Sequence, residues 1–137
     1  MKHLAIILCA LLASIALHGQ NNDPIVGKWQ NPSGEGRIEI FTKGDKFFGT
    51  LYWIEDTNKK DTKNPDKNLQ DRKIQGLEIL TGFVKDGRTY SGGEIYDPKS
   101  GKTYSCKMTL KGENKLDIRG YIGISLLGRT ETWTRIK

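Results

Sequence analysis

The last third of the chain, from Gly92 to Arg135, is the segment that most restricts the fold. Three runs of alternating apolar and polar residues are separated there by two short clusters of turn-forming residues, 97–101 and 111–114. Alternation with a period of two is typical of strands with one buried face, and such short links join antiparallel neighbours. The segment therefore predicts an antiparallel β-meander, and it contains no recognisable catalytic motif.

The same alternation continues through most of the chain, without a helical period over ten or more residues after residue 19. Links rich in Gly, Asn, Asp or Pro join successive runs as hairpins. Eight consecutive antiparallel strands favour an all-β, up-and-down barrel, because closure leaves no exposed sheet edge. A two-sheet sandwich is the alternative. The expected strands are Val26–Gln30, Gly36–Thr42, Lys46–Glu55, Leu77–Val84, Thr89–Tyr96, Lys102–Lys111, Lys115–Tyr121 and Gly128–Ile136.

The first 19 residues have the pattern of an export signal rather than of a folded element. Lys2 precedes an apolar run of 14 residues that ends at Leu17, which is too short to span a bilayer. Gly19 is a small residue of the kind that suits the cleaved position. We therefore expect residues 1–19 to be a signal peptide, residues 20–137 to form a single domain, and the protein to be periplasmic or secreted. An N-terminal membrane anchor is the alternative.

Composition restricts the possible chemistry. Both histidines, His3 and His18, lie in the expected signal, so the exported domain would have none. This excludes Ser–His and Cys–His nucleophile pairs and the usual His/Cys zinc sites, and we expect neither a metal nor a cofactor. Cys106 alternates with Met108 and Leu110, which indicates a buried structural thiol. The net charge of +6 is spread along the chain, which does not favour nucleic acid as a partner.

One long loop, Asp56–Gly76, interrupts the series of short hairpin links. Loops of this length in compact domains are usually functional or disordered. Two interpretations remain open, a lid over one mouth of the barrel and a solvated insertion. Acid pairs also occur, Glu78 with Glu94 on neighbouring expected strands and Asp66 with Asp71 in this loop. Two carboxylates can hydrolyse glycosides, but the spacing here singles out no pair.

The last expected strand carries candidate ligand-binding residues. Arg129, Glu131 and Trp133 alternate on one face. If Trp133 points into the barrel, the two charged residues do too, and a buried arginine needs a partner such as a carboxylate. The opposite orientation, with both charges in solvent, remains open. Together with one arginine of the preceding strand and two aromatic residues, the expected ligand-binding set is Arg119, Arg129, Glu131, Trp133, Tyr104 and Trp53.

The tripeptide Gly27-Lys28-Trp29, followed by a meander, resembles the start of the lipocalin and fatty-acid-binding-protein superfamily. In that superfamily the tryptophan closes one end of the barrel, and an arginine of the last strand packs across it. The last expected strand here offers Arg129 and Arg135. The resemblance implies structural roles for Trp29 and Arg135, because a guanidinium can stack on an indole ring and donate to carbonyls.

A larger set of motifs resembles a bacterial family of exported proteins, the domain-of-unknown-function family 2147. The motifs are Ile95–Tyr104, Arg119–Gly123, Thr132–Arg135, Gly27–Trp29, Asn64–Asp66 and Gly76–Leu80. The resemblance covers nearly all of residues 20–137 and implies a lipocalin-like barrel, export and no established activity. Some members carry cysteines where this chain has Tyr121 and Leu127, so no disulfide is implied here. The family provides no catalytic residues to transfer.

Three functions remain open. The first is an exported binding protein for a small apolar or amphipathic molecule, with Arg119 and Arg129 at its polar head and a pocket of roughly 300 Å³ or more. The alternative is an envelope structural or protein-interaction module, with a filled barrel and an exposed apolar patch around Ile122–Leu127. A carboxylate hydrolase is less favoured, since it needs two acids facing one cleft. We expect a binding protein rather than an enzyme, and the sequence does not predict its oligomeric state.

Overall fold

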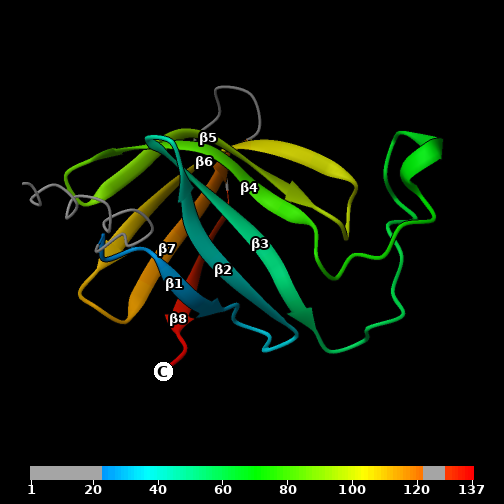
Figure 1. Ribbon diagram of the computed structural model, residues 1–137, viewed down its shortest axis with the longest axis horizontal. Helices are drawn as coiled ribbons and strands as arrows, with labels where there is room; N and C mark the ends of the chain where they lie inside the picture. The colour runs from blue at the N-terminus through cyan, green and yellow to red at the C-terminus, as the bar shows by residue number, and fades with distance from the viewer. Residues whose placement is uncertain (1–22, 122–128) are drawn as a thin grey trace, which may run out of the picture.

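A computed structural model describes residues 23–121 and 129–137, which form eight strands: β1 (Gly27–Gln30), β2 (Gly36–Lys43), β3 (Lys46–Ile54), β4 (Glu78–Asp86), β5 (Thr89–Asp97), β6 (Lys102–Lys111), β7 (Lys115–Tyr121) and β8 (Arg129–Arg135). Each strand pairs antiparallel with the next, and β1 pairs with β8 through Trp29–Arg135 and Gln30–Thr134 (Figure 1). The predicted up-and-down barrel is therefore confirmed, and the sandwich is excluded.

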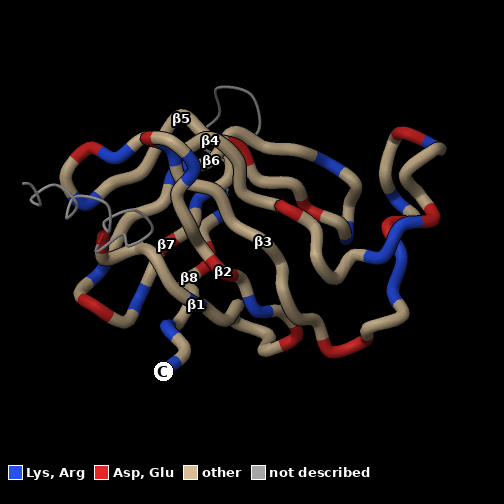
Figure 2. Tube along the Cα trace, viewed as in Figure 1, with Lys and Arg blue, Asp and Glu red and all other residues tan. Residues whose placement is uncertain are grey.

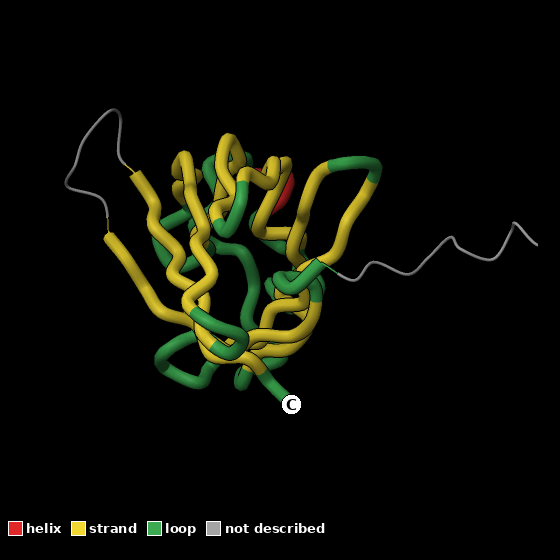
Figure 3. The backbone as a smooth tube through the Cα atoms, turned by 90° about the vertical axis from the view of Figure 1, so that its left-hand side faces the viewer, coloured by secondary structure: helices red, strands yellow, loops and turns green. Residues whose placement is uncertain are grey.

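The eight strands surround one interior (Figure 3). Alternate side chains of the strands point into it, as the burial patterns of β6 and β7 show. In β6, Cys106, Met108 and Leu110 are buried, and in β7 Leu116 and Ile118 are buried. The residues between them face outward and are polar or charged, so one face of each strand removes apolar surface from water. Burial also raises the pKa of the Cys106 thiol to about 12, which keeps it protonated and unreactive.

One end of the barrel, here termed the closed end, is sealed by the segment before β1 and by the last residue of β8. Ile25 is fully buried, and its carbonyl accepts a hydrogen bond from the Trp29 indole Nε1 at 2.9 Å. The Arg135 guanidinium lies 4.3 Å from the centre of the Trp29 ring. It donates through Nε to the Glu113 carbonyl at 2.7 Å and through Nη1 to the Val26 carbonyl at 3.4 Å. Trp29 and Arg135 thus join both ends of the sheet.

A carboxylate strengthens the closed end. The Tyr90 hydroxyl donates to Asp23 Oδ1 at 2.5 Å, and Lys85 Nζ lies 2.6 Å from Asp23 Oδ2. Burial alone would raise the pKa of Asp23, but hydrogen bonds from Lys85, Tyr90 and the Ile25 N–H outweigh it and lower that pKa. Burial and the same carboxylate raise the pKa of Tyr90. The first described residue of the chain is therefore tied to β5.

The opposite end of the barrel is here termed the mouth. The links β1–β2, β3–β4 and β5–β6 lie at this end, and the link between β7 and β8, residues 122–128, falls outside the described residues. The β3–β4 link is the long loop, and it reaches away from the barrel at the right of Figure 1. Across the described ranges no helix is both long and apolar enough to cross a membrane.

Two glycines let large side chains fill the interior. A Cβ added at Gly93 would lie 2.5 Å from Phe83 Cδ1, and one added at Gly49 would lie 2.7 Å from Leu80 Cδ1. Both large side chains are completely buried. The ring of Phe83 therefore lies directly on the backbone of β5, in space that any other residue at position 93 would occupy.

Replacing Gly93 with alanine is expected to destabilise the barrel by about 1–3 kcal/mol, because the new methyl group must displace the Phe83 ring. Gly120→Ala is the matched control, since its Cβ would meet Tyr104 Cβ at 3.5 Å, an ordinary contact. Urea unfolding followed by tryptophan fluorescence measures both. Equal unfolding midpoints for the two variants would contradict the packing described here.

Candidate functional site

The three candidate residues of β8 share the inward face. Trp133 is buried, and its indole Nε1 donates to Glu131 Oε1 at 3.2 Å. Arg129 Nη2 lies 3.4 Å from Glu131 Oε2. The side-chain exposure rises from Trp133 through Glu131 at 38% to Arg129 at 82%, so the strand climbs from the core to solvent at the mouth. The carboxylate thus links the indole of the core to a guanidinium at the surface.

Other inward-facing residues lie beside this strand. Ile95 pairs with Tyr104 across β5 and β6, and Gly120 pairs with Arg129 across β7 and β8. A Cβ on Gly120 would lie 3.5 Å from Tyr104 Cβ and 3.9 Å from Ile95 Cγ2. Ile95, Tyr104 and Gly120 are half-buried although they face the interior. We name the following residues the mouth group: Ile95, Tyr104, Gly120, Arg129 and Glu131.

The interior below the mouth group is filled by side chains. Its largest fully buried members include Trp29, Tyr90, Phe83, Met108 and Leu116. Two hollows, of about 310 and 530 Å³, lie on the outer wall of β4, β5 and β6. The mouth group therefore lies above a packed core, and neither hollow is the internal pocket that was expected.

Arg119 lies outside the barrel, contrary to the expectation that it meets a ligand in the interior. Its neighbours Ile118 and Gly120 face inward, so strand alternation directs Arg119 outward. Its Nη1 donates to Thr130 Oγ1 at 2.9 Å, and the guanidinium lies 5.3 Å from the Tyr121 ring centre. The polar head of an internal ligand would therefore not reach it.

Trp53 also lies on the outer face, because a β-bulge changes the phase of β3. Ile38 pairs with Leu51, but Arg37 pairs with Trp53, which leaves Tyr52 as the extra residue. One extra residue moves every following side chain to the other face. The Arg37 guanidinium lies 4.5 Å from the Trp53 ring centre. Trp53 therefore packs under an outer-wall arginine rather than lining the interior.

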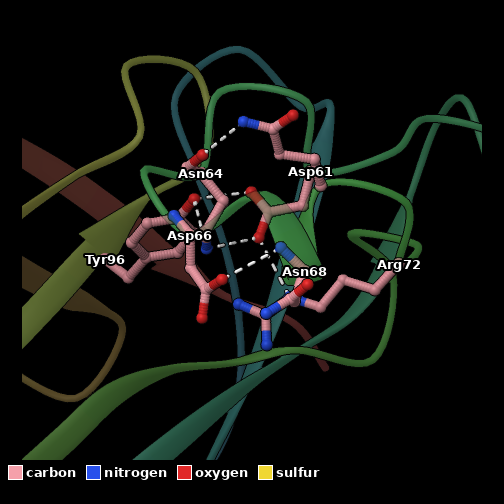
Figure 4. A network of polar contacts seen from close by, with 7 residues as sticks. Asp61, Asn64, Asp66, Asn68, Arg72 and Tyr96 are labelled. Carbon is pink, nitrogen blue, oxygen red and sulfur yellow. Dashed lines mark hydrogen bonds and ion pairs between the residues drawn. The ribbon is translucent and has the colours of Figure 1, made fainter.

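The long loop, residues 56–76, is organised by one buried carboxylate. Asp61 is fully buried and accepts hydrogen bonds from Tyr96 Oη at 2.5 Å, Asn64 Nδ2 at 2.9 Å and Arg72 Nε at 3.0 Å (Figure 4). Because Tyr96 belongs to the outer face of β5, these bonds fasten the loop to the barrel wall. The rest of the loop contains both acidic and basic residues (Figure 2), and most of them are exposed.

The environment of Asp61 sets its ionisation. Burial alone would raise the pKa of Asp61, but the hydrogen bonds from Tyr96, Asn64 and Arg72 outweigh it and lower that pKa. Burial and the neighbouring carboxylate raise the pKa of Tyr96 to about 12. The sequence gives no signal of this burial, because the long loop shows no alternation of apolar and polar residues.

Of the acids considered for hydrolysis, Glu78 and Glu94 line the same hollow on the outer wall, whereas Asp66 and Asp71 of the long loop have separate partners. Asp66 Oδ1 accepts from the Asn68 N–H at 2.9 Å and caps the short 3-10 helix η2 (Lys67–Leu69), while Asp71 pairs with Lys60 at 3.2 Å. The pKa values of the Asp23 and Asp61 carboxyls are lowered. A general acid instead needs a carboxyl whose pKa is raised. Within residues 23–121 and 129–137, no group of three His, Cys, Asp or Glu side chains could hold a metal ion.

The fold is similar to a solved structure. Protein HP1028 from the human pathogen Helicobacter pylori, which is described as belonging to the lipocalin family, superposes with a TM-score of 0.73 at 28% identity. The match covers 82% of each chain. The comparison with curated proteins gives no match. A family model described as an uncharacterized protein conserved in bacteria (DUF2147) matches residues 27–135, and the chain belongs to this family.

Proposed function

We propose that this protein is an exported binding protein that holds a small amphipathic molecule at the mouth of its barrel. The lipocalin-like fold supports binding of a small ligand, since barrels of this size are either filled by side chains or hold one small ligand. The apolar N-terminal run supports export. The proposal concerns a shallow site, because the space below the mouth group is occupied.

The observation that carries this proposal is the position of Glu131, at the boundary between core and solvent. Its carboxylate accepts from the Trp133 indole and faces the Arg129 guanidinium. Arg129 pairs with Gly120, and the half-buried Tyr104 lies next to Gly120. At position 120 the neighbouring strand β7 has a glycine, so no side chain fills the space there. An apolar group can therefore lie against Tyr104 above Gly120, while a polar head such as a carboxylate meets Arg129.

The filled interior favours a second candidate, an envelope structural or protein-interaction module. The apolar patch expected for that function, Ile122–Leu127, lies outside the described residues. A module of this kind would bind no amphipathic molecule at the mouth. The experiment below therefore separates the two functions.

Decanoate is a suitable probe, because it combines an apolar chain with a carboxylate. Arg129→Gln is expected to weaken its binding roughly tenfold, since one charge-assisted hydrogen bond is lost. Glu131→Gln is expected to strengthen binding, because the carboxylate that competes for Arg129 is removed. Isothermal titration calorimetry measures the dissociation constants. Arg119→Gln is the matched control, since it removes an identical charge from the outer wall of the adjacent strand.

Equal effects of Arg129→Gln and Arg119→Gln would contradict a site at the mouth. Absence of decanoate binding, together with absence of a retained small molecule in native mass spectrometry of the protein from its natural host, would favour the structural module. Native mass spectrometry would also give the oligomeric state.

A further inference from the structure

The outer wall of β4, β5 and β6 carries the two hollows of about 310 and 530 Å³. Both are lined by Thr81 and Glu94, so they adjoin, and we name the two hollows together the outer groove. Glu94 and Thr81 are outward-facing partners on neighbouring strands, on the opposite side of the wall from the mouth group. The groove is therefore separate from the site proposed above.

Glycines line part of the larger hollow. Gly82 and Gly92 have φ of +74° and +78°, and a Cβ at either position would meet nothing within 4 Å. The strand register explains this gap, since Thr81 pairs with Glu94 and the next pair is Val84 with Ser91. Between these two pairs, residues 82 and 83 of β4 have no register partner among residues 92 and 93 of β5. No side chain therefore covers the backbone at Gly82 and Gly92. An extended chain can approach this backbone closely.

The smaller hollow has a fixed wall. Its rim includes Asn64, Arg72 and Tyr96, the three residues that converge on buried Asp61. Asn64 Nδ2 also lies 3.3 Å from the Tyr96 hydroxyl. These bonds hold the loop side of the hollow in one arrangement before any ligand arrives, which lowers the entropic cost of binding. Three residues of the rim are thus held in place by hydrogen bonds within the protein.

Charges are arranged unequally along the outer groove. Arg72 is paired with Asp61, and Glu78 lies 3.5 Å from Lys43, so the charges at the loop end are largely balanced. Glu94, where the two hollows meet, has no ion-pair partner among the described residues.

The larger hollow is lined by Lys46 and Lys107, and in the described part of the chain no acid pairs with either of them. The larger hollow therefore carries one carboxylate and two ammonium groups without an ion-pair partner among the described residues, together with several glycine and serine residues. An extended molecule with a positive and a negative end would complement both charges.

We propose that the outer groove binds short peptides with free ends. The peptide ammonium group meets Glu94, its carboxylate meets Lys46 and Lys107, and its backbone crosses the floor at Gly82 and Gly92. Hydroxyl groups of Thr81, Ser91 and Ser105 line the same hollow and can exchange hydrogen bonds with peptide groups. A blocked terminus removes one of the two charges, so binding depends on both free ends.

Tri-alanine with free ends is the probe, compared with its N-acetylated and C-amidated forms. Amide chemical shifts of the protein, followed by NMR during titration, give the dissociation constants. Glu94→Gln is expected to weaken binding of free tri-alanine at least about threefold and to leave the N-acetylated form unchanged. The double variant Lys46→Gln/Lys107→Gln is expected to weaken free tri-alanine and to leave the amidated form unchanged. Shift changes are expected at Gly82, Ser91 and Gly92.

Matched controls carry the same charge changes elsewhere. Glu39 lies on β2 and Lys28 on β1, and the variants Glu39→Gln and Lys28→Gln are both expected to bind tri-alanine as the unaltered protein does. Glu131→Gln changes the mouth group. If this variant alters decanoate binding but not tri-alanine binding, the two sites are separate. The proposal is overturned if blocked and free tri-alanine bind equally, if none binds, or if Glu131→Gln weakens tri-alanine while Glu94→Gln does not.

Discussion

Trp29→Ala is expected to destabilise the protein by about 3–5 kcal/mol, because the change leaves a large cavity at the closed end. Trp29 is completely buried, and its indole N–H satisfies the buried carbonyl of Ile25. Its ring also supports the Arg135 guanidinium, which donates to the Glu113 carbonyl of the β6–β7 link. The substitution therefore removes packing, a hydrogen bond and the support for a guanidinium together.

Trp53→Ala is the matched control for this prediction. Trp53 is the same residue type on the outer face, half-buried beneath Arg37. Its removal is expected to cost roughly 1 kcal/mol, the order of an exposed cation–π contact. Trp29→Phe provides a milder variant if the alanine variant does not fold. Chemical denaturation gives the free energies of unfolding, and similar losses for Trp29→Ala and Trp53→Ala would contradict a closed end stabilised by Trp29.

The fold follows from features that the sequence displays directly. Alternation in β6 and β7 predicts which side chains are buried, and the turn clusters predict where each strand ends. The Gly27-Lys28-Trp29 tripeptide and Arg135 were predicted as a structural pair, and they lie together at the closed end. These features are local or repeated, so a reader of the chain can find them without knowing its tertiary contacts.

The candidate site was only partly predictable. Alternation places Arg129, Glu131 and Trp133 on one face, and the structure shows that this face points inward. The phase of β3 could not be read, because the bulge at Tyr52 depends on how β2 and β3 pair rather than on a local pattern. Arg119 differs from this case, since its alternation with Ile118 already indicates an outward position.

The long loop gives the least information in sequence and the most in structure. Its open interpretations were a lid and a solvated insertion, and the structure shows a segment fastened to the outer wall through Asp61 and Tyr96. The same chemistry recurs at the closed end, where Tyr90 donates to Asp23. Two part-buried carboxylate–phenol bonds therefore fasten the segment before β1 and the long loop to the barrel. Such pairs join residues 35 and 67 positions apart, which no local pattern predicts.

Asp61→Ala is expected to release the long loop, because it leaves the Tyr96 hydroxyl, the Asn64 amide and the Arg72 guanidinium without their shared acceptor. Because Arg72 remains partly exposed, the loss of these hydrogen bonds is expected to cost about 1–3 kcal/mol. Amide hydrogen exchange at Asn64 and Arg72 measures the release. Asp71→Ala is the matched control, because it removes an exposed carboxylate of the same loop. Equal exchange in both variants would show that Asp61 does not hold the loop.

The pH dependence of loop protection provides an independent test. The folded pKa of Asp61 lies below its ordinary value of 3.8, so its contribution is present above that value and is lost as pH falls through the folded pKa. The folded pKa of Tyr96 is raised from 10.0 to about 12, so its contribution is complete below pH 10 and is lost as pH rises toward 12. Protection should therefore be greatest between about pH 4 and 10. Tyr96→Phe is expected to abolish the loss of loop protection at alkaline pH and to keep the loss at acid pH, because Asp61 remains. If protection is still lost at alkaline pH in this variant, the loss belongs to Tyr90 and Asp23 at the closed end.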